Sequence, residues 1–186
     1  MLERGQEVVM VLEDDIRFEP YFRYKLQNIL EETRRQNLDW DLIYLGRKRL
    51  ADPDEESWLS GSRQLVWAGY SYWTLGYLLR YSGAQKLVGG NPLPRLIPVD
   101  EYIPVLSDKH PEESWKAHFP QRDLNVLSVA PLLLYPTHYT GEKGYVSDTE
   151  DSRVVPETNG KGASTLLDSS PDILLAPSPS SPREDL

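Results

Sequence analysis

The chain has 186 residues, a formal net charge of −9 at pH 7, and no cysteine. The negative charge and the lack of a basic cluster argue against general binding to nucleic acid or to anionic membranes. Disulfides, thiolate catalysis and zinc–cysteine sites are excluded, and no apolar run reaches the about 20 residues of a membrane span. Because only 39% of the residues are hydrophobic, we expect one folded domain and an additional unfolded part.

The first predicted element is the apolar run Val8–Leu12, which ends in three consecutive acids, Glu13, Asp14 and Asp15. The run predicts a strand buried on both faces of a parallel or mixed sheet, and ligands of such sheets bind at the carboxyl ends of the strands. If the strand continues, Glu13 and Asp15 project to the same face and suit Mg²⁺ or Mn²⁺ on a nucleotide diphosphate. A solvated turn capped by Asp14 or Asp15 explains the acids equally well.

Pro20 predicts the first turn of a helix that packs on the core through one apolar stripe. The stripe comprises Phe22, Leu26, Ile29 and Leu30, and the charges expected to face water are Glu31, Glu32, Arg34 and Arg35. Residues 41–46 then predict a second buried strand, which Gly46 closes. Strand, helix and strand in this order predict a βαβ-like unit.

Arg47, Lys48 and Arg49 follow the second predicted strand. Three cations at a strand end could hold a phosphate or a carboxylate. They could also open a polar loop, because residues 51–57 are mostly acidic and polar. We predict the loop for Lys48 and Arg49, and Arg47 stays open as a candidate ligand for an anion.

Residues 67–79 are unusually rich in aromatic side chains. Their alternation with small residues predicts a strand or a hairpin, in which Gly69 and Gly76 allow close backbone approach. Most of these aromatic rings are expected in the core, but some could form a platform for a sugar ring or a uracil base. The exceptions we expect are Tyr70, Tyr72 and Trp73.

Residues 82–88 predict a capped helix that stops at Gly89. Farther along, Asp100 and Glu101 follow a Pro-Val step, and two acids there are typical of a helix start. Either carboxylate could instead act as a general base that takes the proton of an acceptor hydroxyl. His110, next to a proline, is expected to be an ordinary surface histidine.

Residues 126–135 predict another buried strand, interrupted at Pro131. The strand leads to His138, which could complete a metal site or donate to a phosphate, or could be an ordinary loop histidine. From residue 151 onward, proline, serine, glycine and acids dominate, so residues 151–186 predict a disordered acidic tail.

Seven segments are distinctive as a set, and they occur in this order along the chain: Val11-Leu12-Glu13-Asp14-Asp15, residues 40–48, Tyr70-Ser71-Tyr72-Trp73-Thr74-Leu75, Pro98-Val99-Asp100-Glu101, Lys116-Ala117-His118-Phe119, Tyr135-Pro136-Thr137-His138-Tyr139 and residues 144–150. Together they closely resemble the carboxyl-terminal half of procollagen galactosyltransferases, which are glycosyltransferase family 25 enzymes. The resemblance covers nearly all of the chain up to Glu150.

This resemblance implies a GT-A-like α/β nucleotide-sugar transferase domain in residues 1–150, partial because the first strands of that fold are absent. It also implies an inverting, Mn²⁺-dependent transfer of galactose from UDP-galactose to hydroxylysine of collagen in the endoplasmic reticulum lumen. On the matching motifs, Glu13 and Asp15 are the metal ligands, and Asp100 and Glu101 are candidates for the base or for acceptor binding. The candidate donor-binding residues are Asp14, Arg47, Tyr72 and His138.

Two features depart from the family pattern. The chain ends in Arg183-Glu184-Asp185-Leu186, which exchanges the two acids of an Arg-Asp-Glu-Leu retrieval signal. The chain also reaches its first strand almost at once, so we expect it to be part of a larger protein. The alternatives left open are a catalytically inactive adhesion or interaction module, as a family-related adhesion protein suggests, and a transferase with another donor or acceptor.

Overall fold

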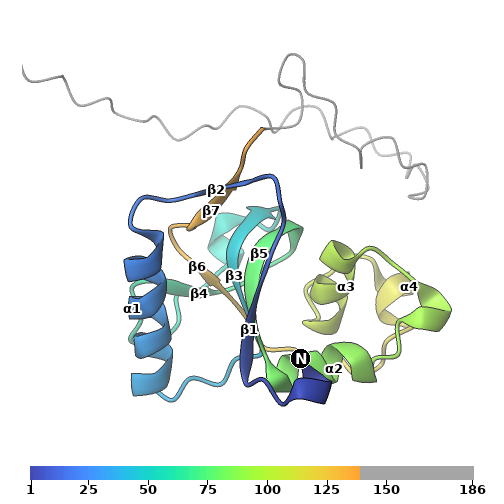
Figure 1. Cartoon of the computed structure of the whole chain (residues 1–186). Coiled ribbons are helices and arrows are strands. Elements are labelled where there is room, and N and C mark those ends of the chain that lie inside the picture. The colour runs from blue at the N-terminus through green and yellow to red at the C-terminus, as the bar shows by residue number, and fades with distance from the viewer. Residues whose placement is uncertain (139–186) are drawn as a thin grey trace, which may run out of the picture. The chain divides into compact units, whose positions relative to one another are not determined.

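The computed structural model describes residues 1–138, in which a central sheet lies between helix α1 on one side and helices α3 and α4 on the other (Figure 1). The α/β class predicted from the sequence is confirmed. The predicted tail, its boundary at residues 150–151 and the C-terminal tetrapeptide lie outside the described residues.

The secondary-structure elements have the following bounds. The strands of the main sheet are β1 (Val8–Leu12), β3 (Leu42–Arg49), β4 (Leu65–Trp67), β5 (Ser71–Arg80) and β6 (Val126–Val129), and β2 (Ile16–Phe18) and β7 (Leu134–Pro136) form a separate pair. The helices are α1 (Phe22–Arg35), α2 (Tyr81–Gly89), α3 (Val99–Leu106) and α4 (Glu113–Lys116), with short 3-10 turns at Leu2–Arg4, Pro53–Glu55 and Leu93–Arg95.

The main sheet has the strand order β1-β5-β3-β6-β4. Only β3 and β6 pair in parallel, and the other three pairings are antiparallel. Because β1 and β3 are both antiparallel to β5, they run in the same direction, with α1 between them in sequence. The βαβ-like unit is therefore present, but β5 is inserted between its two strands.

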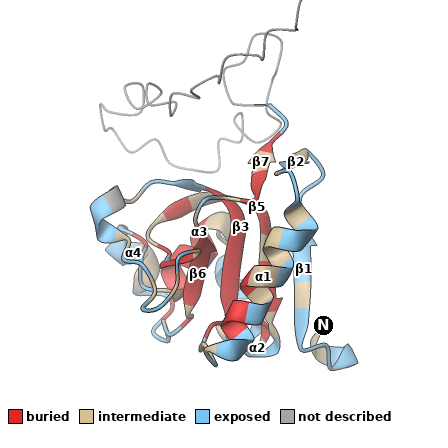
Figure 2. Cartoon of the chain, turned by 90° about the vertical axis from the view of Figure 1, so that its left-hand side faces the viewer, coloured by how far each residue is buried: buried red, intermediate tan, exposed pale blue. Residues whose placement is uncertain are grey.

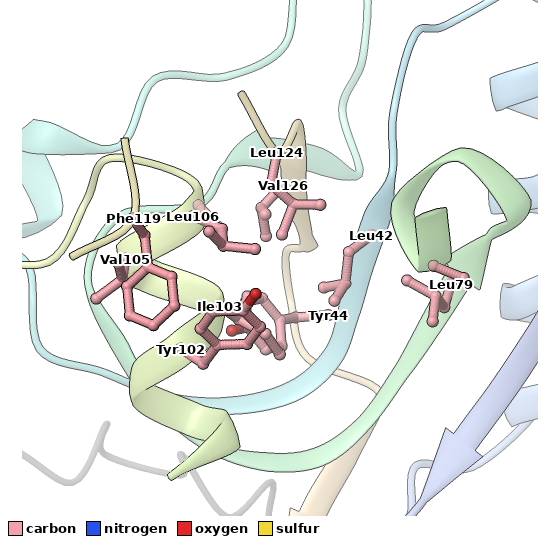
Figure 3. Close-up of a cluster of buried hydrophobic side chains, with 12 residues drawn as sticks. Leu42, Tyr44, Leu79, Tyr102, Ile103, Val105, Leu106, Phe119, Leu124 and Val126 are labelled. Carbon is pink, nitrogen blue, oxygen red and sulfur yellow. The ribbon is translucent and has the colours of Figure 1, made fainter. Parts of the chain in front are cut away.

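The centre of the core is β3, whose side chains alternate between two apolar clusters. Leu42 and Tyr44 pack toward α3, and Figure 3 shows them meeting Tyr102 and Ile103 of that helix. Ile43 and Leu45 belong to the opposite cluster, which includes Ile29 of α1. Burial of each such side chain contributes about 1.5–3 kcal/mol, so this strand fixes both helical layers at once.

The prediction that Val8–Leu12 is buried on both faces is wrong. The strand β1 is an edge strand that pairs only with β5, and Val8, Met10, Val11 and Leu12 are 37–44% exposed. Figure 2 shows this contrast between β1 and the buried strands β3 and β6. An apolar run identifies a strand but does not say whether a second strand pairs with its other side.

The second strand is longer than predicted. It continues past Gly46 to Arg49, so Lys48 and Arg49 belong to the sheet and not to a loop, although both side chains are exposed. The pairing with β5 shifts register between Tyr44 and Lys48, which marks a β-bulge. Across this irregular stretch Trp73 takes a left-handed backbone conformation with φ of 63°. Such strain in a bulky residue is uncommon and concentrates at functional sites.

The predicted strand over residues 126–135 is indeed interrupted at Pro131, and its two parts are β6 and β7. After the break, Leu134 crosses the sheet at the pair Gly46 and Gly76. A Cβ at Gly76 would collide with Leu134 and would lie 2.8 Å from Leu12. The predicted close approach at Gly76 is confirmed, because the Leu134 side chain occupies the space that a Cβ would need.

Both predicted helices are present, with corrections. Helix α1 begins at Phe22, so Pro20 precedes the helix and does not form its first turn. Helix α2 ends at Gly89 as expected, but no side chain caps its start, so the predicted cap is absent. Glu32, however, was expected to face water and is only 8% exposed, because it faces the segment before β4, where Gln64 donates to it at 3.0 Å. None of the helices in the described part of the chain has the length and apolar character needed to cross a membrane.

Candidate active site

The aromatic segment Tyr70–Thr74, which comprises the residue before β5 and the start of that strand, contacts both acidic motifs of the chain. At one end, the Thr74 hydroxyl donates a 2.7 Å hydrogen bond to Glu13 Oε1. At the other, the Tyr70 hydroxyl donates a 3.1 Å bond to Glu101 Oε2. The aromatic segment thus contacts both motifs, a relation that the sequence spacing did not show.

The first acidic motif, Glu13–Asp15, forms the exposed connection between β1 and β2. Because the strand ends at Leu12, the alternation that placed Glu13 and Asp15 on one face does not extend to Asp15. The Thr137 backbone N–H donates a 2.7 Å bond to the Asp15 carbonyl. This bond places His138, the next residue, at the same end of the molecule as the acids.

The described residues contain no cluster of three or more histidine, aspartate or glutamate side chains arranged to hold a metal ion. A closed protein site for a metal is therefore not present in residues 1–138. Mg²⁺ and Mn²⁺ with nucleotides commonly take only one or two carboxylates and fill the rest with water and phosphate oxygens. The exposed, oxygen-only donors Glu13 and Asp15 fit a metal of that kind, and their role as ligands stays a prediction.

The second acidic motif lies at the start of α3, as the helix-start interpretation predicts. Its two carboxylates differ in environment. Glu101 is 7% exposed and bonded, whereas Asp100 is half-buried. Burial chiefly, and then the charges of Glu101 and Asp100, raise the pKa of the Tyr72 hydroxyl.

The prediction that His110 is an ordinary surface histidine is wrong, because His110 is only 4% exposed. Its Nε2 lies 2.9 Å from Glu101 Oε2, and its ring stacks on Trp115 with centroids 4.8 Å apart. The Tyr70 ring meets it edge-on at 5.0 Å. No short-range pattern could have found this group, because its members come from the residue before β5, from α3, from α4 and from the loop between the two helices.

The tyrosines of the site are protonated donors at neutral pH. Burial is the main cause that raises the pKa of Tyr70, and the nearby Tyr72 and Glu101 raise it further. Tyr70 and Tyr72 also pack edge to face, with ring centroids 5.4 Å apart. Both are half-buried, as is Trp73, and a role of these rings as a platform for a sugar or a base stays a prediction.

Arg47 is buried within the protein, and its recorded hydrogen bonds go to protein groups. The guanidinium is 6% exposed and forms a two-pronged ion pair with Glu56 at 2.7 and 2.8 Å. It also donates to Ser128 Oγ at 2.8 Å and to Ser71 Oγ at 2.6 Å. These contacts give Arg47 a structural role, and its donor-binding role stays a prediction.

Two surface hollows lie away from the acidic motifs. One of about 330 Å³ is lined by Arg47, Glu56 and the Ala130–Leu132 segment, and one of about 280 Å³ by residues around Trp67 and Asn125. Neither includes Glu13, Asp15 or Asp100 among its lining residues. Among the predicted donor-binding residues, Asp14 and His138 lie at the first motif and Tyr72 lies near the second. Arg47 instead lines the larger of these two hollows.

No protein-family model matches the chain. The chain is 55% identical over 174 residues to a protein named glycosyltransferase 25 family member from Anopheles gambiae, covering 94% of the chain and 29% of that relative. It is 53% identical over 154 residues to procollagen galactosyltransferase 1 of Danio rerio, covering 83% of the chain and 26% of the relative. It is 48% identical over 154 residues to procollagen galactosyltransferase 2 of Homo sapiens, covering 83% and 25%. The chain thus spans about a quarter of the length of the curated relatives it matches.

Proposed function

Because the chain is homologous to glycosyltransferase 25 family proteins over most of its own length, we propose that it is part of an enzyme that transfers galactose from UDP-galactose to hydroxylysine of collagen. The observation that carries the proposal is that one short aromatic segment, Tyr70–Thr74, is hydrogen-bonded to both acidic motifs. The site of action we propose is the lumen of the endoplasmic reticulum, on the family resemblance.

In this proposal the first motif holds the donor. Glu13, oriented by Thr74, and the exposed Asp15 bind Mn²⁺, and Asp14 and His138 contact the nucleotide sugar nearby. The chemistry that the bound ion supplies is neutralisation of charge on the departing diphosphate. Tyr72 offers a ring and a hydroxyl to the sugar. Arg47, already paired with Glu56, is proposed as a further contact of the nucleotide sugar.

The second motif activates the acceptor. An inverting transfer needs a carboxylate that takes the hydroxyl proton while the oxygen attacks the anomeric carbon and the bond to the diphosphate breaks. Glu101 Oε2 already accepts hydrogen bonds from Tyr70 and His110. Asp100 is more exposed, so we assign the base to Asp100.

The test measures turnover of UDP-galactose on a hydroxylysine-containing collagen peptide, with Mn²⁺ and with a chelator. It uses the 186-residue chain and any longer natural form that contains it. Asp100→Asn is expected to lower kcat by about 100-fold or more, the scale of general base catalysis. Asp15→Asn is expected to weaken the response to Mn²⁺. Asp54→Asn, an exposed acid of the β3–β4 loop, is the matched control.

Several outcomes would overturn the proposal or part of it. Turnover that ignores chelators would remove the metal assignment, and equal turnover with UDP-glucose would remove galactose as the defined sugar. If no form of the protein turns over UDP-galactose or binds it in calorimetry, the proposed function is wrong and an interaction module is the better description.

A further inference from the structure

We propose that His110 is a positioning residue for the acceptor side of this site. Together with Tyr70 it holds the Glu101 carboxylate in place, which fixes the first turn of α3 and leaves the neighbouring Asp100 as the carboxylate that meets the acceptor. The inference rests on the proposed function and assigns a role to a residue that none of the sequence motifs contains.

The hydrogen bonds of His110 define which ring nitrogen carries the proton. The Glu112 backbone N–H lies 2.9 Å from His110 Nδ1 and can only donate, so Nδ1 accepts and is unprotonated. The proton of the neutral ring is therefore on Nε2, 2.9 Å from Glu101 Oε2. His110 is then a neutral donor to a carboxylate, an arrangement that leaves none of these buried groups unpaired.

The start of α3 lacks a side-chain cap that would hold its first turn. The helix has only eight residues, its N-cap is Pro98, and no side chain caps its start. At its other end, the backbone N–H groups of Lys109 and His110 both donate to the Pro104 carbonyl, at 2.9 and 3.1 Å. The chain thus folds back so that the His110 ring returns to Glu101 in the first turn. Loss of either donor would weaken the link between Glu101 and its surroundings.

Aromatic packing also holds the His110 ring in place. The ring lies between Trp115, stacked at 4.8 Å, and Tyr70, edge-on at 5.0 Å. With 4% of its surface exposed, His110 is shielded from substrate. Its effect on the reaction must therefore pass through Glu101 and the helix start, which makes it a positioning residue and not a catalytic one.

The first test compares His110→Ala with His110→Gln, whose amide can donate where Nε2 did. His110→Ala is expected to lower kcat by about 10- to 100-fold, since a small misplacement of a reacting group has effects on that scale. The KM for UDP-galactose should stay within about twofold, because the donor motif is held elsewhere. His110→Gln should recover a large part of kcat.

A second variant separates a loss of positioning from a loss of folding. Tyr70→Phe keeps the aromatic ring and removes only the hydroxyl that donates to Glu101, so it should lower kcat in the same direction with little change in thermal unfolding. Unchanged kcat in both His110→Ala and Tyr70→Phe would overturn the positioning role and leave the proposed function intact.

A third measurement does not depend on activity. Nitrogen-15 NMR of the unsubstituted protein near pH 7.5 should show His110 as the neutral ring protonated at Nε2. A ring protonated at Nδ1 would overturn the inference whatever the turnover. If the unsubstituted protein has no turnover while the NMR result is as expected, the proposed function fails and the positioning role fails with it.

Discussion

The buried pair Arg47–Glu56 gives the sharpest prediction for stability. The two side chains are 4% and 3% exposed, and Glu56 also accepts a 2.8 Å bond from the Gly69 backbone N–H. Replacing Glu56 by alanine removes the carboxylate from all of these contacts. It leaves a buried guanidinium that keeps only its bonds to Ser71 and Ser128.

The expected cost follows from that geometry. Breaking a buried pair by removing one partner leaves an uncompensated charge and costs about 3–5 kcal/mol of unfolding free energy. At about 3 °C per kcal/mol for a domain of this size, the melting temperature should fall by about 9–15 °C. The double variant Arg47→Met with Glu56→Leu leaves no unpaired charge, so it should lose less than Glu56→Ala alone.

The assay is urea unfolding followed by tryptophan fluorescence, with thermal unfolding by circular dichroism. The matched control is Glu19→Ala, which breaks the half-exposed pair with Lys25 and should cost less than about 1 kcal/mol. A loss of under 1 kcal/mol for Glu56→Ala, or a double variant less stable than Glu56→Ala, would refute the reasoning.

Two further predictions concern packing and acid stability. Gly76→Val should lower the free energy of unfolding by about 3 kcal/mol or more, because its side chain would collide with Leu134. At Gly89 a Cβ meets nothing within 4 Å, so Gly89→Ala should leave that free energy unchanged or raise it by up to about 1 kcal/mol. Urea unfolding of both variants checks this prediction. Burial alone would raise the pKa of Asp41, but hydrogen bonds from Lys86 and other donors lower it below its usual value. A lowered folded-state pKa contributes stability above the unfolded-state value, near 3.9, and that stability is lost as pH falls through the folded pKa. Melting temperatures between about pH 6 and 3 should therefore fall less steeply for Asp41→Asn than for the unsubstituted chain; equal slopes would contradict the assignment.

The features that the sequence predicted correctly depend on residues close together in the chain, and those it missed depend on residues far apart. Helix α1, its apolar stripe and the buried run of β3 were predicted because their periodicity lies within about ten neighbouring residues. The break at Pro131 and the helix start at Asp100 were predicted for the same reason, since proline and acidic first turns act locally. The two acidic motifs were predicted as sites from residue type and from the family resemblance, and that role stays a prediction.

Only the tertiary structure decided which of these segments meet. It placed the apolar run Val8–Leu12 at an edge, because strand order depends on pairing between distant segments. It joined Glu13 to Thr74, 61 residues away, and Arg47 to Ser128, 81 residues away. It also showed that His110, expected at the surface, is buried beside Glu101. Local sequence sets each strand and helix, but the energy of a buried charge depends on partners that folding brings from elsewhere in the chain.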